Sequence, residues 1–429
     1  DLPGVPPRVF RGSAPVDRCS GAYPEMEART AMKAEKGSQR PPLSTGRLPE
    51  PIPLSRPVLT PEDIEVVTRV LESGWLTMGP KVEEFEQAFA QAHGHERATA
   101  VASCTAGLHL ALMALDIGPG DEVIIPSLTF VAAANTVAAV GATPVVADIV
   151  SLERPHLDPA SVRERITART KAVMIMHYAG YMSDPAPWRE LRAGRGLKII
   201  EDAAHAPLAP GAGSVGDVTV FSFFSNKNMT TAEGGMILAS DEALLERCRL
   251  LRCHGMTSAT YARHSQPLLS YDVTAPGLNC RLDEIRAALG ISQLSRLSAW
   301  NAERGRLSTL YRSLLAEDPP DVRVPFAPDH PSCWHIMPVL VPEGADRDRV
   351  RLLMRDMGIQ TSMHYPPIHS FSCYSKMRVG SGLPRTEAFS GREITLPLYP
   401  GLADADVGRV VALLEEALTL SRRETGGRP

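Results

Sequence analysis

KIIEDAAHAPLAPGAGSVGDVTVFSFFSNKNMTTAEGGMILA, residues 198–239, contains three short apolar runs separated by polar and glycine-rich segments. The runs at 198–201, 218–223 and 236–239 have the length and the apolar content of buried strands. Asp202 follows the first run, and Lys227 stands shortly after the second. Because open α/β sheets bind ligands at the carboxyl ends of their strands, this stretch predicts both a fold class and the place of a site.

The alternation of strands and helices continues on both sides of this stretch. Further strands are predicted at 99–102, 122–125, 144–149 and 172–177, with helices at 61–71, 82–93 and 103–115. Thr60 and Pro61 are typical of a helix start, and this first helix carries Ile64, Val67, Val70 and Leu71 on one face. The pattern predicts an α/β fold whose central sheet is mostly parallel and covered by helices on both faces.

A smaller α/β unit is predicted after a long helix that begins near Leu282. Its strands are expected at 335–340 and 361–364, and its helices at 346–357 and 404–420. We therefore expect a large domain over residues 56–295 and a small C-terminal domain over residues 296–429. Residues 1–55 are rich in Pro and Arg and lack apolar periodicity. We expect this extension to be disordered, because it cannot bury enough surface to offset the loss of chain entropy.

Composition excludes several classes of partner. Of 429 residues, 45 are Lys or Arg and 49 are Asp or Glu, so the net charge of −4 gives no footprint for nucleic acid. No apolar run reaches the roughly 18 residues that a membrane span needs. The seven cysteines show no C-x-x-C spacing, which favours reduced thiols and a cytoplasmic protein. Cys248 and Cys253 fall on different faces of a predicted helix, so we expect no metal site.

Four groups near strand ends are candidates for chemistry, and each has an ordinary alternative. Lys227 is a candidate buried amine nucleophile, or a surface lysine whose stem is covered. Asp202 either holds a cationic ligand or caps the end of its strand. The Ser103–Gly107 turn either binds a phosphate at a helix start or is an N-cap. Phe130 is either a stacking platform or a core residue.

Together these groups make the four parts that pyridoxal phosphate requires. They are an amine for the Schiff base, a carboxylate for the pyridine nitrogen, a phosphate cradle and an aromatic ring that stacks on the cofactor. They occur in one chain and at one predicted sheet edge. The sequence therefore predicts pyridoxal 5'-phosphate as the cofactor.

From about Pro53 to Tyr399 the chain resembles the DegT/StrS-type sugar aminotransferases, which are fold-type I pyridoxal-phosphate enzymes. The resemblance rests on motifs that occur in this order: SGWLTMGP at 73–80, GPGDEV at 118–123, EDAAH at 201–205, GD at 216–217, FSF at 221–223, NK at 226–227, EGGM at 233–236, NCRL at 279–282 and QL at 293–294. In two places the chain differs from the usual pattern, with Cys104 for a glycine and Cys280 for an aromatic residue.

The resemblance assigns a role to each matching residue. It implies that Lys227 forms the Schiff base and that Asp202 pairs with the pyridine nitrogen. Further cofactor contacts are implied for a set of residues around the ring and phosphate: Thr105, Ala106, Phe130, His205 and Ser222. Asn279 matches an asparagine that reaches the phosphate of the neighbouring subunit's cofactor, which implies a homodimer with shared active sites.

The activity implied is that of a pyridoxal-phosphate-dependent aminotransferase. It would move an amino group from an amino acid, expected to be L-glutamate, to a keto group of a nucleotide-linked sugar or a related keto-cyclitol. The pathway implied is secondary-metabolite or surface-glycan biosynthesis. Candidate substrate contacts are His177, Tyr178, His364 and Tyr365, with His369 nearby. Each of these also reads as a buried histidine bonded to backbone or a tyrosine at a domain boundary.

Three other functions are alternatives to this one. Dehydratase-type relatives that use the pyridoxamine form carry histidine in place of the lysine, so Lys227 argues against them. A non-catalytic regulator that binds the cofactor would not need both Lys227 and Asp202. A nicotinamide dehydrogenase would require G-x-G-x-x-G after its first strand, and the segment 103–107 lacks that pattern.

Overall fold

The computed structural model describes residues 50–257, 270–317, 321–375, 377 and 382–425. The chain divides into two units, residues 1–47 and residues 48–429, and the description below concerns the second unit. The disorder predicted for residues 1–55 therefore falls, up to residue 49, outside the described residues. At the end of that predicted extension, Ile52 is 4% exposed and pairs with Ile359.

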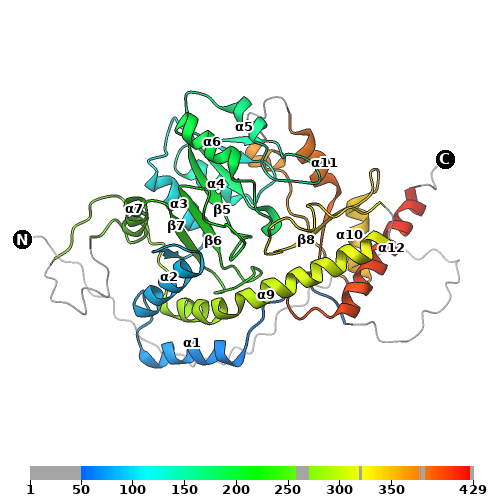
Figure 1. The fold of residues 1–429 in the computed structure, drawn as a ribbon, viewed down its shortest axis with the longest axis horizontal. Helices are drawn as coiled ribbons and strands as arrows, with labels where there is room; N and C mark the ends of the chain where they lie inside the picture. Colours follow the sequence, from blue (N-terminus) through cyan, green and yellow to red (C-terminus); the bar gives the residue numbers. More distant parts are fainter. Residues whose placement is uncertain (1–49, 258–269, 318–320, 376, 378–381, 426–429) are drawn as a thin grey trace, which may run out of the picture. The chain divides into compact units, whose positions relative to one another are not determined.

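A seven-stranded sheet forms the centre of the described unit (Figure 1). Its order is β1-β7-β6-β5-β4-β2-β3, and only β7 runs antiparallel to its neighbours. The strands, in chain order, are β1 (Thr99–Val101), β2 (Glu122–Pro126), β3 (Thr143–Ala147), β4 (Thr170–Met176), β5 (Lys198–Asp202), β6 (Val218–Ser222) and β7 (Gly235–Ala239). The predicted α/β fold with a mostly parallel sheet is confirmed.

Helices cover both faces of this sheet because successive strand residues point in opposite directions. Val123 and Ile125 pack on one face, while Ile124 packs on the other. The first face is covered by α3 (Cys104–Ala114), α4 (Ala132–Ala139) and α7 (Glu242–Arg252). The second is covered by α2 (Pro80–Ala92), α5 (Pro159–Arg165), α6 (Ala186–Arg195) and the long α9 (Glu284–Glu317).

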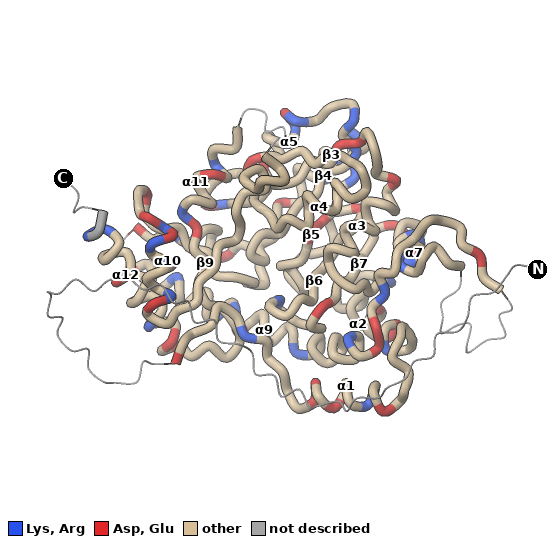
Figure 2. Tube along the Cα trace, turned by 180° about the vertical axis from the view of Figure 1, so that it is seen from behind, with Lys and Arg blue, Asp and Glu red and all other residues tan. Residues whose placement is uncertain are grey.

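Helix α1 (Pro61–Ser73) begins as the sequence predicts. Thr60 caps it and exchanges hydrogen bonds with Asp63, which forms a capping box. Its apolar face is only partly buried: Val70 is buried, whereas Ile64 and Leu71 are 66% and 53% exposed. The charged residues along this helix are mostly acidic, whereas α10 (Arg347–Asp356) carries both signs (Figure 2).

The C-terminal part of the unit has a second apolar core around a two-stranded antiparallel sheet. This core is built by β8 (Met337–Leu340), β9 (Glu393–Leu396), α10 (Arg347–Asp356) and α12 (Asp404–Thr425). The short 3-10 turns η2 (Ile368–Ser370) and η3 (Ser372–Tyr374) pack instead with the first face of the large sheet, and α11 (Pro384–Arg392) packs through Phe389 in a third cluster. The C-terminal half of α9 packs against the second core. Helix α9 is therefore continuous through the predicted domain boundary at residues 295 and 296.

One predicted strand of this second core is wrong. Residues 361–364 form only an isolated bridge, between Ser362 and Thr395, and the partner of β8 is β9. Ile394 and Leu396 of β9 pack in the core, while the alternate residues Glu393 and Thr395 are polar yet fully buried. Of the described helices, none is long and apolar enough to cross a bilayer.

Candidate active site

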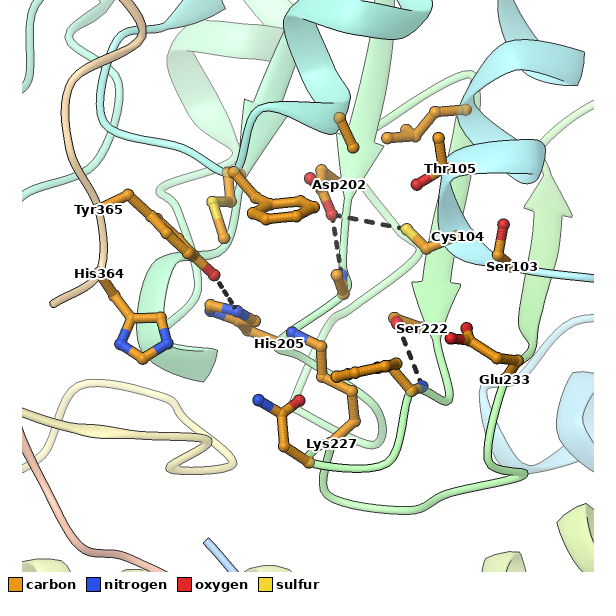
Figure 3. Close-up of a pocket in the computed structure, with 17 residues that line it drawn as sticks. Ser103, Cys104, Thr105, Asp202, His205, Ser222, Lys227, Glu233, His364 and Tyr365 are labelled. Carbon is orange, nitrogen blue, oxygen red and sulfur yellow. Dashed lines mark hydrogen bonds between the residues drawn. The ribbon is translucent and has the colours of Figure 1, made fainter. Parts of the chain in front are cut away.

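A cavity of about 370 Å³ opens at the carboxyl ends of β5 and β6 (Figure 3). Its walls come from the start of α3, the end of β5, the loop after β6 and the segment before η2. Asp202 and Lys227 both line it, so the two residues that the sequence singled out first are brought together. In Figure 3 the Lys227 side chain extends into the cavity toward His205, with Asp202 on the wall above.

Asp202 is a buried carboxylate that has no cationic side chain bonded to it among the described residues. It is 4% exposed and accepts a hydrogen bond from the backbone N–H of Ala204 at 3.0 Å. The Cys104 thiol lies 4.0 Å from the same oxygen. Burial raises the pKa of Asp202, against the opposing effects of that backbone bond and of Lys227. A buried carboxylate in this state favours a cationic ligand group, such as a protonated ring nitrogen.

Lys227 is held where its amine loses water. It follows β6 in a tight turn in which its backbone N–H donates to Phe224 O at 2.9 Å. Burial lowers the pKa of Lys227 to about 8, although Asp202 and then Cys104 act to raise it. A lysine with this pKa is partly neutral near physiological pH, as a Schiff-base nucleophile and proton carrier must be.

The start of α3 forms the predicted anion cradle. Ser103 is the N-cap, and its hydroxyl accepts from Ala106 N–H at 3.1 Å. Among the described residues nothing accepts from the N–H groups of Cys104 and Thr105, and these point outward at the positive end of the helix. A Cβ on Gly235 would lie 2.8 Å from Cys104 N, so only glycine lets β7 approach the cradle this closely.

These features fit pyridoxal phosphate. The N-terminus of α3 with Thr105 and Ser222 would hold the phosphate, Asp202 the ring nitrogen, and Lys227 the aldehyde carbon. Phe130 also lines the cavity and leaves 52% of its surface exposed, as a stacking residue requires.

His205 lines the same cavity in a fixed orientation. Its Nδ1 accepts from Ala179 N–H at 3.2 Å, so its Nε2 carries the proton and donates to the Tyr365 hydroxyl at 2.8 Å. Burial, followed by the charges of Lys227 and His364, holds the pKa of His205 well below its ordinary value. The Tyr365 hydroxyl proton therefore remains available to a ligand in the cavity.

His364 is also oriented, through a relay that ends at Glu393. When Glu393 is ionised, Thr395 Oγ1 donates to Glu393 Oε1 at 2.5 Å, so Thr395 accepts from His364 Nδ1 at 2.7 Å. Glu393 Oε2 accepts from the backbone N–H of His364 at 2.8 Å. The polarity of this relay leaves His364 Nε2 as a hydrogen-bond acceptor.

Four predicted site residues do not line the cavity. His177 is fully buried, donates through Nε2 to Glu201 at 2.8 Å and accepts from Ser183 N–H. Tyr178 donates its hydroxyl to the backbone oxygen of His364 at 2.5 Å. Ala106 N–H is bonded to the N-cap, as described above, and Asn279 is exposed away from the cavity. The roles assigned to these four residues stay predictions.

The sequence did not single out His335, whose Nε2 lies 3.5 Å from Lys227 Nζ. It precedes β8 and shows no pattern that distinguishes it from an ordinary core histidine. His369 bonds to Ser127 at 2.8 Å and lies outside the cavity. Across the described residues, His, Cys, Asp and Glu form no group of three or more that could bind a metal.

Comparison with known proteins matches most of the chain. The model of the DegT/DnrJ/EryC1/StrS aminotransferase family matches residues 57–415. The spore coat polysaccharide biosynthesis protein SpsC of Bacillus subtilis (strain 168) is 38% identical over 377 residues, covering 85% of this chain and 96% of SpsC. The resemblance drawn from the motifs is confirmed.

Two solved structures share the fold. Spr1654 from Streptococcus pneumoniae, in its PMP form, has a TM-score of 0.80 and 29% identity, covering 86% of this chain and all (100%) of that one. DesI, solved in the presence of its TDP-sugar product, has a TM-score of 0.79 and 32% identity, covering 88% and 95%. The predicted fold-type I architecture is confirmed.

Proposed function

The chain belongs to the DegT/DnrJ/EryC1/StrS aminotransferase family, and we propose that it aminates a keto group on a nucleotide-linked sugar or related keto-cyclitol, with L-glutamate as donor. It is a pyridoxal-phosphate-dependent aminotransferase. The observation that carries the proposal is a single cavity with three features. It is lined by a buried carboxylate that has no cationic side chain bonded to it, by a half-buried lysine whose amine has a lowered pKa, and by the start of helix α3. The TDP-sugar product of DesI and the coat polysaccharide role of SpsC support the acceptor class and a role in glycan or secondary-metabolite biosynthesis.

When bound, pyridoxal phosphate supplies an aldehyde that takes up the amino group and a ring that accepts the electron pair of the substrate carbon. The chain supplies the proton carrier, because Lys227 Nζ has a pKa near 8 and faces the cavity. Asp202 balances positive charge on the ring side, and its burial strengthens that interaction. We assign His364 Nε2 and the Tyr365 hydroxyl to hydroxyl groups of the acceptor, because both line the cavity.

The proposal includes a homodimer with shared active sites. Lys227 is the one Lys or Arg among the described residues that line the cavity, whereas the cofactor phosphate and a nucleotide-linked sugar carry several negative charges. Further cations or donors must then come from elsewhere, and exposed Asn279 is the candidate carried by the resemblance. Ile64, Leu71 and Leu76 offer an exposed apolar surface for a second copy. The mass of the protein in solution tests this, and a monomer would contradict it.

We also place the enzyme in the cytoplasm. The support is that every described cysteine is free: Cys104, Cys248, Cys253, Cys280, Cys333 and Cys373. Free thiols are typical of reducing compartments. Fractionation of the native cells, with the protein traced by an antibody, tests the location.

Absorbance of the purified enzyme tests the reaction. The bound cofactor should absorb near the visible range, lose that band with L-glutamate and regain it with a suitable keto sugar. A panel of nucleotide-linked keto sugars and keto-cyclitols, read by product mass, then identifies the acceptor. An enzyme whose spectrum responds to no amino donor would contradict the proposal.

The variant Lys227→Ala tests the role of Lys227 in the reaction. It removes the nucleophile and proton carrier, so amino transfer should fall by several orders of magnitude. Binding of the cofactor should persist, because Asp202 and the α3 start remain. Turnover close to that of the wild type would refute the role of Lys227.

A further inference from the structure

His335 approaches the catalytic amine from outside the set of residues that the family resemblance assigns. It lies just before β8, is 3% exposed, and places Nε2 at 3.5 Å from Lys227 Nζ. Its ring also stacks at an angle on His205, with the centroids 4.2 Å apart. Packing alone would explain the ring stacking but would not determine which ring nitrogen faces the lysine.

A chain of hydrogen bonds determines that nitrogen. Asn301 donates through Nδ2 to Pro207 O at 3.0 Å, so its Oδ1 is the atom that accepts from Asn228 Nδ2 at 2.8 Å. Asn228 Nδ2 also donates to Cys333 O at 2.9 Å. The side-chain oxygen of Asn228 is then the atom that meets His335 Nδ1 at 2.8 Å. Because an amide oxygen only accepts, Nδ1 of His335 must carry the proton.

The other nitrogen of His335 is therefore a lone-pair acceptor. Burial holds the pKa of His335 well below its ordinary value, and the charges of His205, Lys227 and Arg304 act in the same direction. A neutral imidazole protonated at Nδ1 presents an unprotonated Nε2. Lys227, which has only donors when charged, faces that atom.

The backbone around His335 is fixed from two sides. Its N–H donates to Ala179 O at 2.9 Å, and Arg304 donates to its carbonyl oxygen at 3.2 Å. Gly180 has a φ of +88°, and a Cβ there would lie 2.9 Å from Cys333 Sγ and 3.0 Å from His335 N. Glycine at 180 thus permits the close approach that places the ring beside the lysine.

We infer that His335 is a positioning residue for the catalytic amine: its Nε2 holds the Lys227 nitrogen in the cavity whenever that nitrogen is not bonded to the cofactor. This inference rests on the proposed function for its role in the reaction, but not for the contact itself. A free lysine side chain has many rotamers, and an acceptor at a fixed place limits them to those that reach the reacting atoms. The relay Asn301–Asn228–His335 supplies that acceptor from three separate segments.

The protonation of Lys227 in the cofactor-free full-length chain tests the contact. The pH dependence of its modification by an amine-directed acylating reagent, read by peptide mass spectrometry, gives the midpoint, expected near 8 in the wild type. An ammonium binds an acceptor about twice as strongly as a neutral amine does. His335→Phe should therefore lower the midpoint by about one pH unit. His335→Gln should restore it, because one amide can donate to Asn228 and accept from Lys227.

The control is His156→Phe, which removes another buried histidine. His156 bonds to the backbone oxygen of Tyr181 and does not line the cavity. It should leave the Lys227 midpoint at the wild-type value. An unchanged midpoint in folded His335→Phe would overturn the inference. So would wild-type protein labelled with ¹⁵N-histidine in which His335 is protonated at Nε2, and this measurement needs no variant to fold.

The two proposals fail separately. If the chain were no aminotransferase, the holoenzyme would transfer no amino group while the midpoints of the variants stayed as expected here. If the inference alone were wrong, transfer would proceed and the midpoint would not respond to His335. In the holoenzyme, His335→Phe should lower kcat and leave KM for the amino donor nearly unchanged, with His335→Gln close to wild type.

Discussion

Glutamine in place of Glu393 should flatten the pH dependence of stability between about pH 4.5 and pH 7. Glu393 is fully buried, and burial raises its pKa from 4.5 to about 7. The groups that oppose this increase are the Thr395 hydroxyl, the backbone N–H of His364, and Arg347 and Arg351 of α10. The neighbouring tyrosines, Tyr178 and Tyr365, have their own pKa values raised, in part by Glu393.

The direction in which stability changes with pH depends on whether the folded or the unfolded state binds the proton of Glu393 more tightly. Between pH 4.5 and 7 the folded protein keeps Glu393 protonated, whereas the unfolded chain has released the proton. The folded state therefore binds more protons, and its stability falls as the pH rises through this window. A shift from 4.5 to about 7, at 1.36 kcal/mol per unit, corresponds to about 3 kcal/mol. The isosteric Glu393→Gln cannot titrate and loses this term.

Urea unfolding at several pH values between 4.5 and 8 measures the effect. The buried histidines also titrate, but they do so in both proteins, so the difference between wild type and Glu393→Gln isolates Glu393. That difference should change by about 3 kcal/mol across the window, in favour of the variant at high pH. Glu72→Gln, on an exposed position of α1, is the control and should follow the wild type. Parallel curves for wild type and Glu393→Gln would refute the reasoning.

Two further substitutions probe the frame of the site. Glu201→Gln removes a buried acceptor bonded to His177 and to three backbone N–H groups, so the free energy of unfolding at pH 7 should fall by about 1–3 kcal/mol. Equal stability in urea would contradict this. Gly235→Ala places a Cβ 2.8 Å from Cys104 N and from Phe221 O, which costs about 1–3 kcal/mol and moves the cradle. The affinity of the Gly235→Ala variant for pyridoxal phosphate, measured by titrating the cofactor-free protein, should drop about tenfold. An affinity equal to that of the wild type would show that the start of α3 does not bind the phosphate.

The pair Lys227 and Asp202 was predictable because both stand at the ends of apolar strands. The alternation of side chains along a strand extends this argument to His177, which does not line the cavity. Asp202 lines the cavity, so its neighbour Glu201 must point to the other face of the sheet. Met176 lines the cavity as well, so His177 points away and meets Glu201. Strand alternation thus explains why His177 is buried rather than on the cavity wall.

Strand β9 was missed for a different physical reason. Residues 393–396 alternate polar and apolar residues and residues 361–364 do not, but an alternation this short predicts a strand that is buried on one face only. What decides is that Glu393 and Thr395 satisfy each other and His364 in a buried relay, which allows a polar strand face inside the protein. Such a relay joins residues from two segments, and no local pattern in either one indicates it.

The histidines around the cavity show why Lys227 is the proton carrier there. Burial holds the pKa of His205, His335 and His364 far below neutrality, and a different partner fixes the tautomer of each. The same burial lowers the pKa of Lys227 only to about 8, because Asp202 supports its charge. Among these four bases, the lysine alone exchanges protons near neutral pH. His335, the one of these histidines whose ring nitrogen contacts Lys227, stays neutral there and can therefore act only as a hydrogen-bond acceptor for the lysine.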